Sequence, residues 1–202
     1  MVNRYHRKKT QNKKPSMREI VRERGIIAVR RPLHETTIPI FEEIATNLIP
    51  ELPNAARLFD PETLGVTIIG FSRFDDHHKR FGASTREIAE KVPSSSKKIE
   101  VGLGSLGIYG SHSKHKLGFS IYGDAIEDEV VAFQEEFRDS GTKLRRDANK
   151  PMGEQAIHIC IALMYEDHIG HFSDPATLSA LGNIALQGIP SEPIYLDKIS
   201  DK

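Results

Sequence analysis

The sequence lacks the features that define several protein classes. It has one cysteine, Cys160, so an internal disulfide and a cysteine-rich zinc site are both excluded. No apolar run approaches the roughly 20 residues that cross a bilayer. The basic N-terminal segment is not followed by the apolar stretch that a secretory signal requires. These absences predict a cytoplasmic protein in a reducing environment with no membrane partner.

The sequence also lacks net charge, because 28 Lys and Arg balance 28 Asp and Glu. The balance is uneven along the chain. Residues 1–31 contain eleven basic and two acidic residues, which gives this segment a charge of +9 and leaves −9 for the remainder. Residues 1–24 are predicted to form a basic, largely disordered arm. Such an arm can bind phosphate backbones, dock on its own acidic body, or act as a solvated tail.

The rest of the chain has enough apolar residues, 38% overall, to build a core. Apolar periodicity predicts a succession of strands and helices. The predicted strands are 25–29, 64–71, 98–109 (one kinked strand or two short ones), 117–122 and 156–164. The predicted helices are 36–48, 84–92, 124–140 and 174–186. The order strand, helix, strand occurs twice, which predicts an α+β fold of two similar lobes. We expect one domain at 25–172, followed by a C-terminal helix and tail at 173–202.

Two of these strands carry polar side chains on one face. Side chains alternate between the two faces of a strand, so Thr67 lies opposite to its apolar neighbours in 64–71. In the same way, His158 and Cys160 lie on the non-core face of 156–164. A histidine in that position is either a hydrogen-bonded structural residue or part of a site.

The order of elements from Ile26 to about Tyr165 resembles the two-histidine (2H) phosphoesterases, the superfamily of bacterial 2′-5′ RNA ligases and RNA 2′,3′-cyclic phosphodiesterases. The segments that carry the likeness are Gly-Ile-Ile-Ala-Val-Arg-Arg-Pro-Leu, Gly-Val-Thr-Ile-Ile, Leu-Gly-Ile-Tyr, Lys-Leu-Gly-Phe-Ser-Ile-Tyr-Gly-Asp and His-Ile-Cys-Ile-Ala. The resemblance implies a bilobal α+β fold, with two antiparallel sheets flanked by helices around a central groove. It also implies two copies of a His-x-Thr/Ser motif facing that groove.

The motifs of this chain depart from the family pattern at two of four positions. His158 matches the second histidine and Thr67 matches the hydroxyl of the first motif. Gly65 stands where the first histidine belongs, and Cys160 stands where the second motif has Thr or Ser. In the family, two imidazoles supply the acid and base that open a cyclic phosphate, and the hydroxyls hold its oxygens. Loss of one positioned acid or base typically slows a reaction by about 10²–10⁴.

Other residues could contribute to such a site. Four histidines could substitute for the missing one: His77, His78, His112 and His115. Arg145 and Arg146 belong to a polar loop that is either solvated or the rim of a groove for an anionic ligand. His34-Glu-Thr36 imitates the motif at a helix start, where the two side chains share no strand face. The Gly-x-Gly-x-x-Gly spacing of 102–107 lacks the strand–turn–helix context of a dinucleotide site and predicts a glycine-kinked strand.

The sequence therefore predicts a 2H phosphoesterase-like protein that binds RNA ends or nucleotide phosphates, with weak or lost phosphodiesterase activity. The predicted catalytic residues are His158 and Thr67. The predicted substrate-binding residues are Cys160, Gly65, Arg145 and Arg146. The pair His168 and His171 has no framing ligands, so no metal or cofactor is predicted. Two alternatives remain open: an active phosphodiesterase that uses a substitute for the first histidine, and a protein-interaction scaffold.

Overall fold

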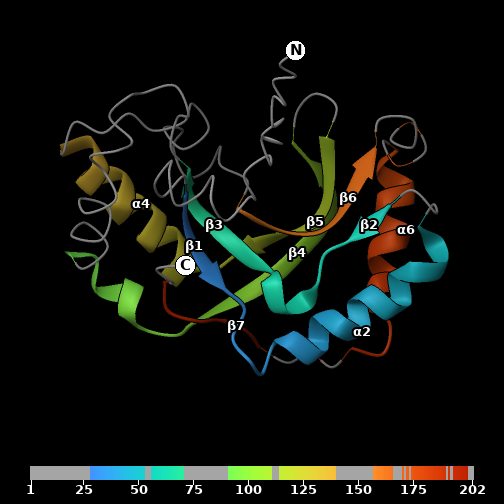
Figure 1. Cartoon of the computed structure of the whole chain (residues 1–202), viewed down its shortest axis with the longest axis horizontal. Coiled ribbons are helices and arrows are strands. Elements are labelled where there is room, and N and C mark those ends of the chain that lie inside the picture. The colour runs from blue at the N-terminus through green and yellow to red at the C-terminus, as the bar shows by residue number, and fades with distance from the viewer. Residues whose placement is uncertain are drawn as a thin grey trace, which may run out of the picture.

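The computed structural model describes residues 28–52, 56–70, 91–110, 114–139, 157–165, 170, 172, 174–189, 191 and 193–199. Its strands are β1 (Ala28–Pro32), β2 (Arg57–Leu58), β3 (Gly65–Gly70), β4 (Ile99–Tyr109), β5 (Lys114–Tyr122), β6 (His158–Tyr165) and β7 (Ile194–Leu196). Its helices are α2 (Ile38–Leu48), α4 (Asp124–Asp139) and α6 (Pro175–Ala185), with short 3-10 turns at Ile49–Glu51, Pro61–Thr63 and Pro93–Ser96. The predicted α+β class is confirmed (Figure 1).

Several predictions fall outside the described residues. They are the basic arm 1–24, the helix 84–92 up to residue 90, Arg145, Arg146, and the candidate histidines His77, His78, His112, His168 and His171.

The described strands join in one hydrogen-bonded order, β1-β3-β6-β5-β4-β7, and β2 adds to β6. The pairings are antiparallel. The two ends of this order also meet, because Leu33 bridges Leu196 and the Asp197 amide donates to the Pro32 carbonyl at 2.9 Å. The sheet is therefore nearly closed, where two separate antiparallel sheets had been expected.

Strand β7 lies within the expected C-terminal tail, which is therefore part of the sheet. It pairs with β4 and buries Ile194 and Leu196. It is also tied to the start of α2, because the Thr37 hydroxyl donates to the Tyr195 carbonyl at 3.1 Å and accepts from the Tyr195 amide at 2.9 Å. The Thr37 hydroxyl therefore holds the C-terminal strand and makes no side-chain cap bond to α2.

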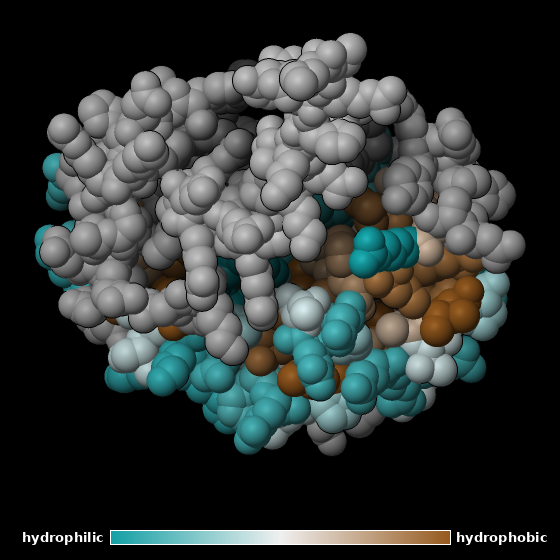
Figure 2. Space-filling view, in the orientation of Figure 1, coloured by the Kyte–Doolittle hydropathy of each residue, from teal (hydrophilic) through white to brown (hydrophobic). Residues whose placement is uncertain are grey.

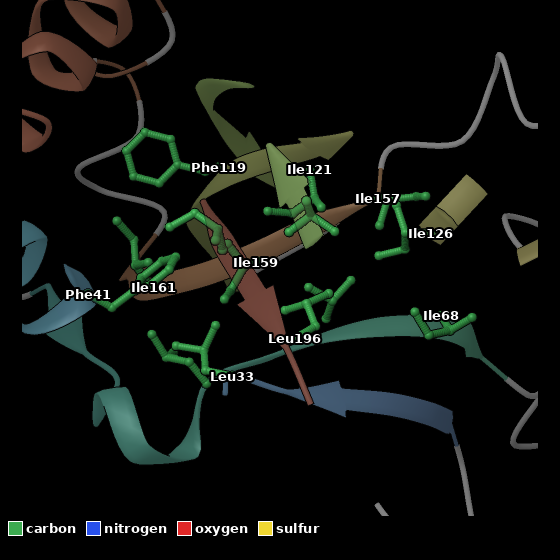
Figure 3. Packing of buried hydrophobic residues seen from close by; sticks show 14 of the residues in the cluster. Leu33, Phe41, Ile68, Phe119, Ile121, Ile126, Ile157, Ile159, Ile161 and Leu196 are labelled. Atoms are coloured by element: carbon green, nitrogen blue, oxygen red, sulfur yellow. The ribbon is translucent and has the colours of Figure 1, made fainter. Parts of the chain in front are cut away.

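The core fills the inside of the curved sheet. The stripes predicted for two helices are buried: Ile40, Phe41, Ile44 and Leu48 of α2, and Ile126, Val130, Phe133 and Phe137 of α4. The apolar faces predicted for β3 and β6 are buried as well, including Val66 and Ile159. Figure 3 shows the side chains of β6, β5 and β7 pointing into this one cluster. The side chains of β3 and β6 that face this cluster are apolar. The polar residues of these two strands therefore lie on the opposite, outer face of the sheet.

Arg31 is a buried charge at the centre of the fold. Its side chain is 0% exposed, as is that of Glu129 on α4, and the two form a bidentate pair with bonds of 2.5 and 2.6 Å. The remaining three guanidinium N–H groups donate to the carbonyls of Ser94, Lys97 and Asp197. All five donors of the guanidinium are thus satisfied. Arg31 belongs to strand β1, although composition alone counts it with the basic N-terminal residues.

Element boundaries differ from prediction by a few residues. Strand β1 continues through Pro32 rather than ending at Val29. Helix α4 begins at Asp124, as predicted, where the Gly123 carbonyl accepts the first helical bonds and Gly123 takes a φ of 145°. Asp174 caps α6, since its carboxylate accepts from the Thr177 amide at 2.9 Å.

Helices α2 and α6 cover one flank of the sheet, and their ends are linked by bonds from the Asn47 amide to the carbonyls of Ala185 and Gln187. Figure 2 shows apolar surface over the region of β2, α2 and α6. The most exposed large apolar residue of the described chain, Ile49, directly follows α2. None of the described helices has the length and apolar content to span a membrane.

Candidate functional site

A row of polar side chains crosses four neighbouring strands on the outer face of the sheet. Arg30 of β1 opposes Thr67 of β3, and His158 of β6 opposes Ser120 of β5. Val66 pairs with Ile159, so the antiparallel register places Thr67 directly beside His158. Arg30 and Thr67 are exposed, whereas His158 and Ser120 are half-buried. We call this row, together with Cys160, Lys116 and Tyr109, the His158 face.

The next row along the strands is rich in glycine. Pro32 pairs with Gly65, and Gly118 of β5 pairs with both Cys160 and Gly107. The register of β3 and β6 places Gly65 beside Cys160. The two residues that depart from the family motifs therefore lie side by side, one step along the sheet from Thr67 and His158.

Gly65 is packed against the backbone of β1. A Cβ atom added at Gly65 would come within 2.5 Å of the Arg31 carbonyl oxygen and 3.1 Å of the Pro32 Cα. The Arg30 guanidinium lies beside the same position and donates to the Gly65 carbonyl at 3.4 Å. The position that the resemblance assigns to the first histidine is therefore closed to a side chain and bordered by a permanent cation.

Tyr109 reaches His158 from two strands away. The rings are stacked, with centroids 4.0 Å apart and an angle of 4° between their planes. The tyrosine ring leans back along β4 over Gly107, where a Cβ atom would come within 3.4 Å of the phenol oxygen. Because Gly107 and Gly118 carry no side chains, nothing from these two positions separates the two rings.

A short chain of hydroxyl groups fixes the far end of this stack. The Tyr109 hydroxyl is hydrogen-bonded to the Ser120 side chain, and the Ser120 hydroxyl donates to the Ser105 carbonyl at 3.3 Å. Burial raises the pKa of Tyr109 above its ordinary value of 10.0, the Ser120 bond partly opposes this, and Cys160 adds to it. Tyr109 is therefore neutral at physiological pH.

Cys160 lies half-buried between two cations. Burial raises the pKa of its thiol above the ordinary value of 9.0, and the charges of Lys116 and then Arg30 partly offset the shift. The thiol is accordingly protonated near neutral pH, where it is a weak hydrogen-bond donor and a poor nucleophile. The electrostatic effect of Lys116 and Arg30 also shows that both cations bear on the same part of this face.

The structure brings together some of the predicted site residues. His158 and Thr67 lie side by side on adjacent strands rather than opposite one another across a cavity, and Cys160 and Gly65 lie in the next row. Sequence reasoning missed Arg30, Lys116, Ser120 and Tyr109. The alternation of Phe119, Ser120 and Ile121 would have placed Ser120 on a polar face, but no local signal connects Tyr109 with His158.

Three further candidates can be assigned among the described residues. His34 is hydrogen-bonded to the Thr36 hydroxyl at 2.9 Å within a turn. This confirms the prediction that the two side chains share no strand face and only imitate the motif. Residues 102–107 lie in β4, whose register shifts between Leu103 and Leu106, as a kinked strand predicts. His115 neighbours Lys116 in β5, and alternation places it on the other face of the sheet. The described residues contain no group of three His, Cys, Asp or Glu side chains able to hold a metal.

Comparisons with known proteins support the fold. No protein-family model matches the sequence, and no curated protein matches it. Among solved structures, TT0787 of Thermus thermophilus is similar with a TM-score of 0.50 and 11% identity, over 68% of this chain and 73% of that one. At this level of identity the likeness shows a similar fold.

Two structures of Usb1 from Kluyveromyces marxianus are more weakly similar. One has a TM-score of 0.49 and 12% identity, over 86% of this chain and 92% of that one. The other, with uridine monophosphate, has a TM-score of 0.47 and 13% identity, over 78% and 79% of the two chains.

Proposed function

We propose that this chain is a 2H phosphoesterase-like protein that binds the phosphate of an RNA end or nucleotide on the His158 face, with phosphodiesterase activity weak or lost. In this proposal His158 and Thr67 contact the phosphate, Cys160 and Gly65 line the site, and Arg145 and Arg146 contribute from its rim. The finer features implied by the family resemblance belong to the same proposal: two lobes around a central groove, a domain at 25–172, and a basic arm at 1–24.

The chemistry of the face favours a phosphate ligand. Arg30 and Lys116 supply positive charge, and a guanidinium matches the geometry of phosphate oxygens. The imidazole of His158 and the hydroxyl of Thr67 supply further donors beside them. Cations and neutral donors that share one exposed sheet face form a binding site for a dianion.

The observation that carries the proposal is the position of Arg30 beside Gly65. A guanidinium can hold a phosphate oxygen, but it stays charged in proteins and exchanges no proton at neutral pH. Of the described residues on this face, His158 is the side chain of the type that titrates near neutrality. Tyr109 and Cys160 are both held in their protonated forms. The face therefore supports binding, and it offers one general acid or base where the family mechanism needs two.

The experiment combines binding and turnover. Uridine 5′-monophosphate (UMP) is titrated by calorimetry at low salt, and hydrolysis of 2′,3′-cyclic UMP is followed by chromatography, with the wild type and His158→Ala. We expect UMP to bind the wild type and to bind His158→Ala more weakly, with no hydrolysis that depends on His158. Hydrolysis abolished by His158→Ala would establish an active phosphodiesterase instead. Absence of UMP binding at low salt would contradict the proposal and favour a protein-interaction scaffold.

A further inference from the structure

Side chains of β5 pack directly against the glycine positions of β4. A Cβ atom at Gly102 would collide with the ring of Tyr122, and one at Gly104 would collide with the Ser120 hydroxyl. Gly107 provides the corresponding space under Tyr109. Because these three positions of β4 are glycines, the rings of Tyr122 and Tyr109 and the hydroxyl of Ser120 can lie close against the strand.

The two tyrosines that pack against these glycines, Tyr109 and Tyr122, differ in what they contact. Tyr109 is half-buried and stacks on His158. Tyr122 is 56% exposed, the largest exposure of any described aromatic residue. It pairs with Gly102 across the strands, and its ring lies over that glycine. Tyr122 thus presents an aromatic surface to solvent.

Tyr122 belongs to the same side of the sheet as the His158 face. Ser120 opposes His158, and Tyr122 follows Ser120 by two residues in β5, with buried Ile121 between them. Two residues along a strand span about 7 Å. The distance from the Tyr122 ring to the proposed phosphate site is therefore about the distance between the phosphate and the base of one nucleotide.

Charge distinguishes the two ends of this surface. Arg30 and Lys116 both act on the thiol of Cys160, so positive charge is concentrated at the His158 end. At the other end the exposed Glu100 lies two residues before Gly102 on the same side of β4, and the ammonium of Lys98 lies over Tyr195, the residue that pairs with Glu100. This distribution places the phosphate at the His158 end and a neutral ring at the Tyr122 end, where the charges are mixed.

We infer that Tyr122 is a stacking platform for the nucleobase of the nucleotide whose phosphate binds at the His158 face. This inference rests on the proposed function and adds the base as a recognised part of the ligand. Aromatic side chains on open sheet faces stack bases with little sequence preference, because every base has a π face. The surface accordingly suits a single-stranded RNA end or a free nucleotide.

The test compares a ligand that has a base with one that has none. UMP and ribose 5-phosphate are titrated by calorimetry into the wild type, Tyr122→Ala and Tyr122→Phe, each checked for folding by circular dichroism. We expect the wild type to bind UMP more tightly than ribose 5-phosphate. Tyr122→Ala is expected to weaken UMP binding roughly 5- to 150-fold and to leave ribose 5-phosphate unchanged. Tyr122→Phe is expected to keep the wild-type preference, because the ring remains.

The possible failures are distinguishable. Equal affinity of the wild type for the two ligands would overturn the stacking platform and leave phosphate binding intact. A Tyr122→Ala variant that weakens both ligands equally would also overturn it, since the residue would then serve the phosphate. Absence of binding by either ligand would overturn both the platform and the proposed function.

Discussion

The imidazole of His158 lies flat against the phenol ring of Tyr109, with ring centroids 4.0 Å apart. Tyr109 is itself held by Ser120, the residue that opposes His158 in the neighbouring strand. The stack therefore fixes the plane of the imidazole and covers one of its faces.

Removal of the stack is expected to weaken ligand binding. Aromatic pairs contribute about 0.5–1.5 kcal/mol, so Tyr109→Leu should weaken UMP binding roughly 2- to 12-fold by releasing the orientation of His158. Tyr109→Phe keeps the ring and should retain most of the affinity. Calorimetry measures the affinity, and the proton shifts of the His158 ring in NMR report the stack. Unchanged affinity and unchanged His158 shifts in Tyr109→Leu would show that the stack has no such role.

Neutralisation of Arg30 should reduce affinity through charge. An exposed ion pair contributes up to about 1 kcal/mol, so Arg30→Met is expected to weaken UMP binding by roughly 2- to 5-fold at low salt. The effect should shrink as salt is added. Arg138→Met, at an exposed arginine of α4, serves as the matched control and should bind as the wild type does. Equal losses in the two variants would point to net charge rather than to a site.

A side chain at Gly65 should destabilise the fold rather than restore activity. The added Cβ meets the Arg31 carbonyl at 2.5 Å, while a Cβ at Gly170 meets no atom within 4 Å. Overpacking commonly costs about 1–3 kcal/mol. Gly65→Ala should therefore lower the free energy of unfolding in urea by that amount, and Gly170→Ala should not lower it. Gly65→His should be destabilised at least as much and gain no hydrolysis of 2′,3′-cyclic UMP. A stable, active Gly65→His protein would refute this account of β1.

The Arg31–Glu129 pair should be the most sensitive charged contact in the described fold. Loss of one partner leaves a buried charge uncompensated, at a cost of about 3–5 kcal/mol. Glu129→Gln and Arg31→Met should each lower the free energy of unfolding by this amount. Lys91→Met breaks an exposed pair with Glu136, at 3.7 Å, and should change stability by less than about 1 kcal/mol. Similar effects at the buried and exposed pairs would contradict the assigned role.

Cys160 offers a chemical measurement of the charges on the His158 face. The thiolate is the reactive form, and the raised pKa of Cys160 makes iodoacetamide labelling slow at pH 7.5 and faster as the pH rises toward and above 9. Lys116→Met removes a charge that lowers this pKa, so it should slow labelling at any fixed pH in that range. Bound UMP should also slow it. Since Cys160 is the single cysteine, whole-protein mass spectrometry gives the rate. Faster labelling of Lys116→Met would reverse the predicted sign.

Local patterns predicted most of the described elements. Apolar stripes at helical spacing located α2 and α4, and alternation located β3 and β6 with their buried faces. Strand β7 was missed because three residues are too few for a periodic signal. The burial of Arg31 was missed because its partner, Glu129, is 98 positions away, and no local pattern marks an ion pair of that separation.

The candidate site was predictable only in part for the same reason. His158 and Thr67 stand out because each interrupts an apolar strand. Tyr109 contacts His158 across an intervening strand, through space left by glycines, and that contact depends on the strand order. From the sequence, Gly65 is interpreted as the replacement of a family histidine. In the fold, Gly65 is a point of close approach between β1 and β3.

The most direct test of the account is an NMR titration of the isotope-labelled protein with UMP at low salt. We expect the largest backbone and side-chain shifts to cluster on four neighbouring strands, at Arg30, Thr67, Ser120, His158 and Cys160. Shifts that cluster elsewhere in the described chain, or no shifts at millimolar UMP, would contradict it.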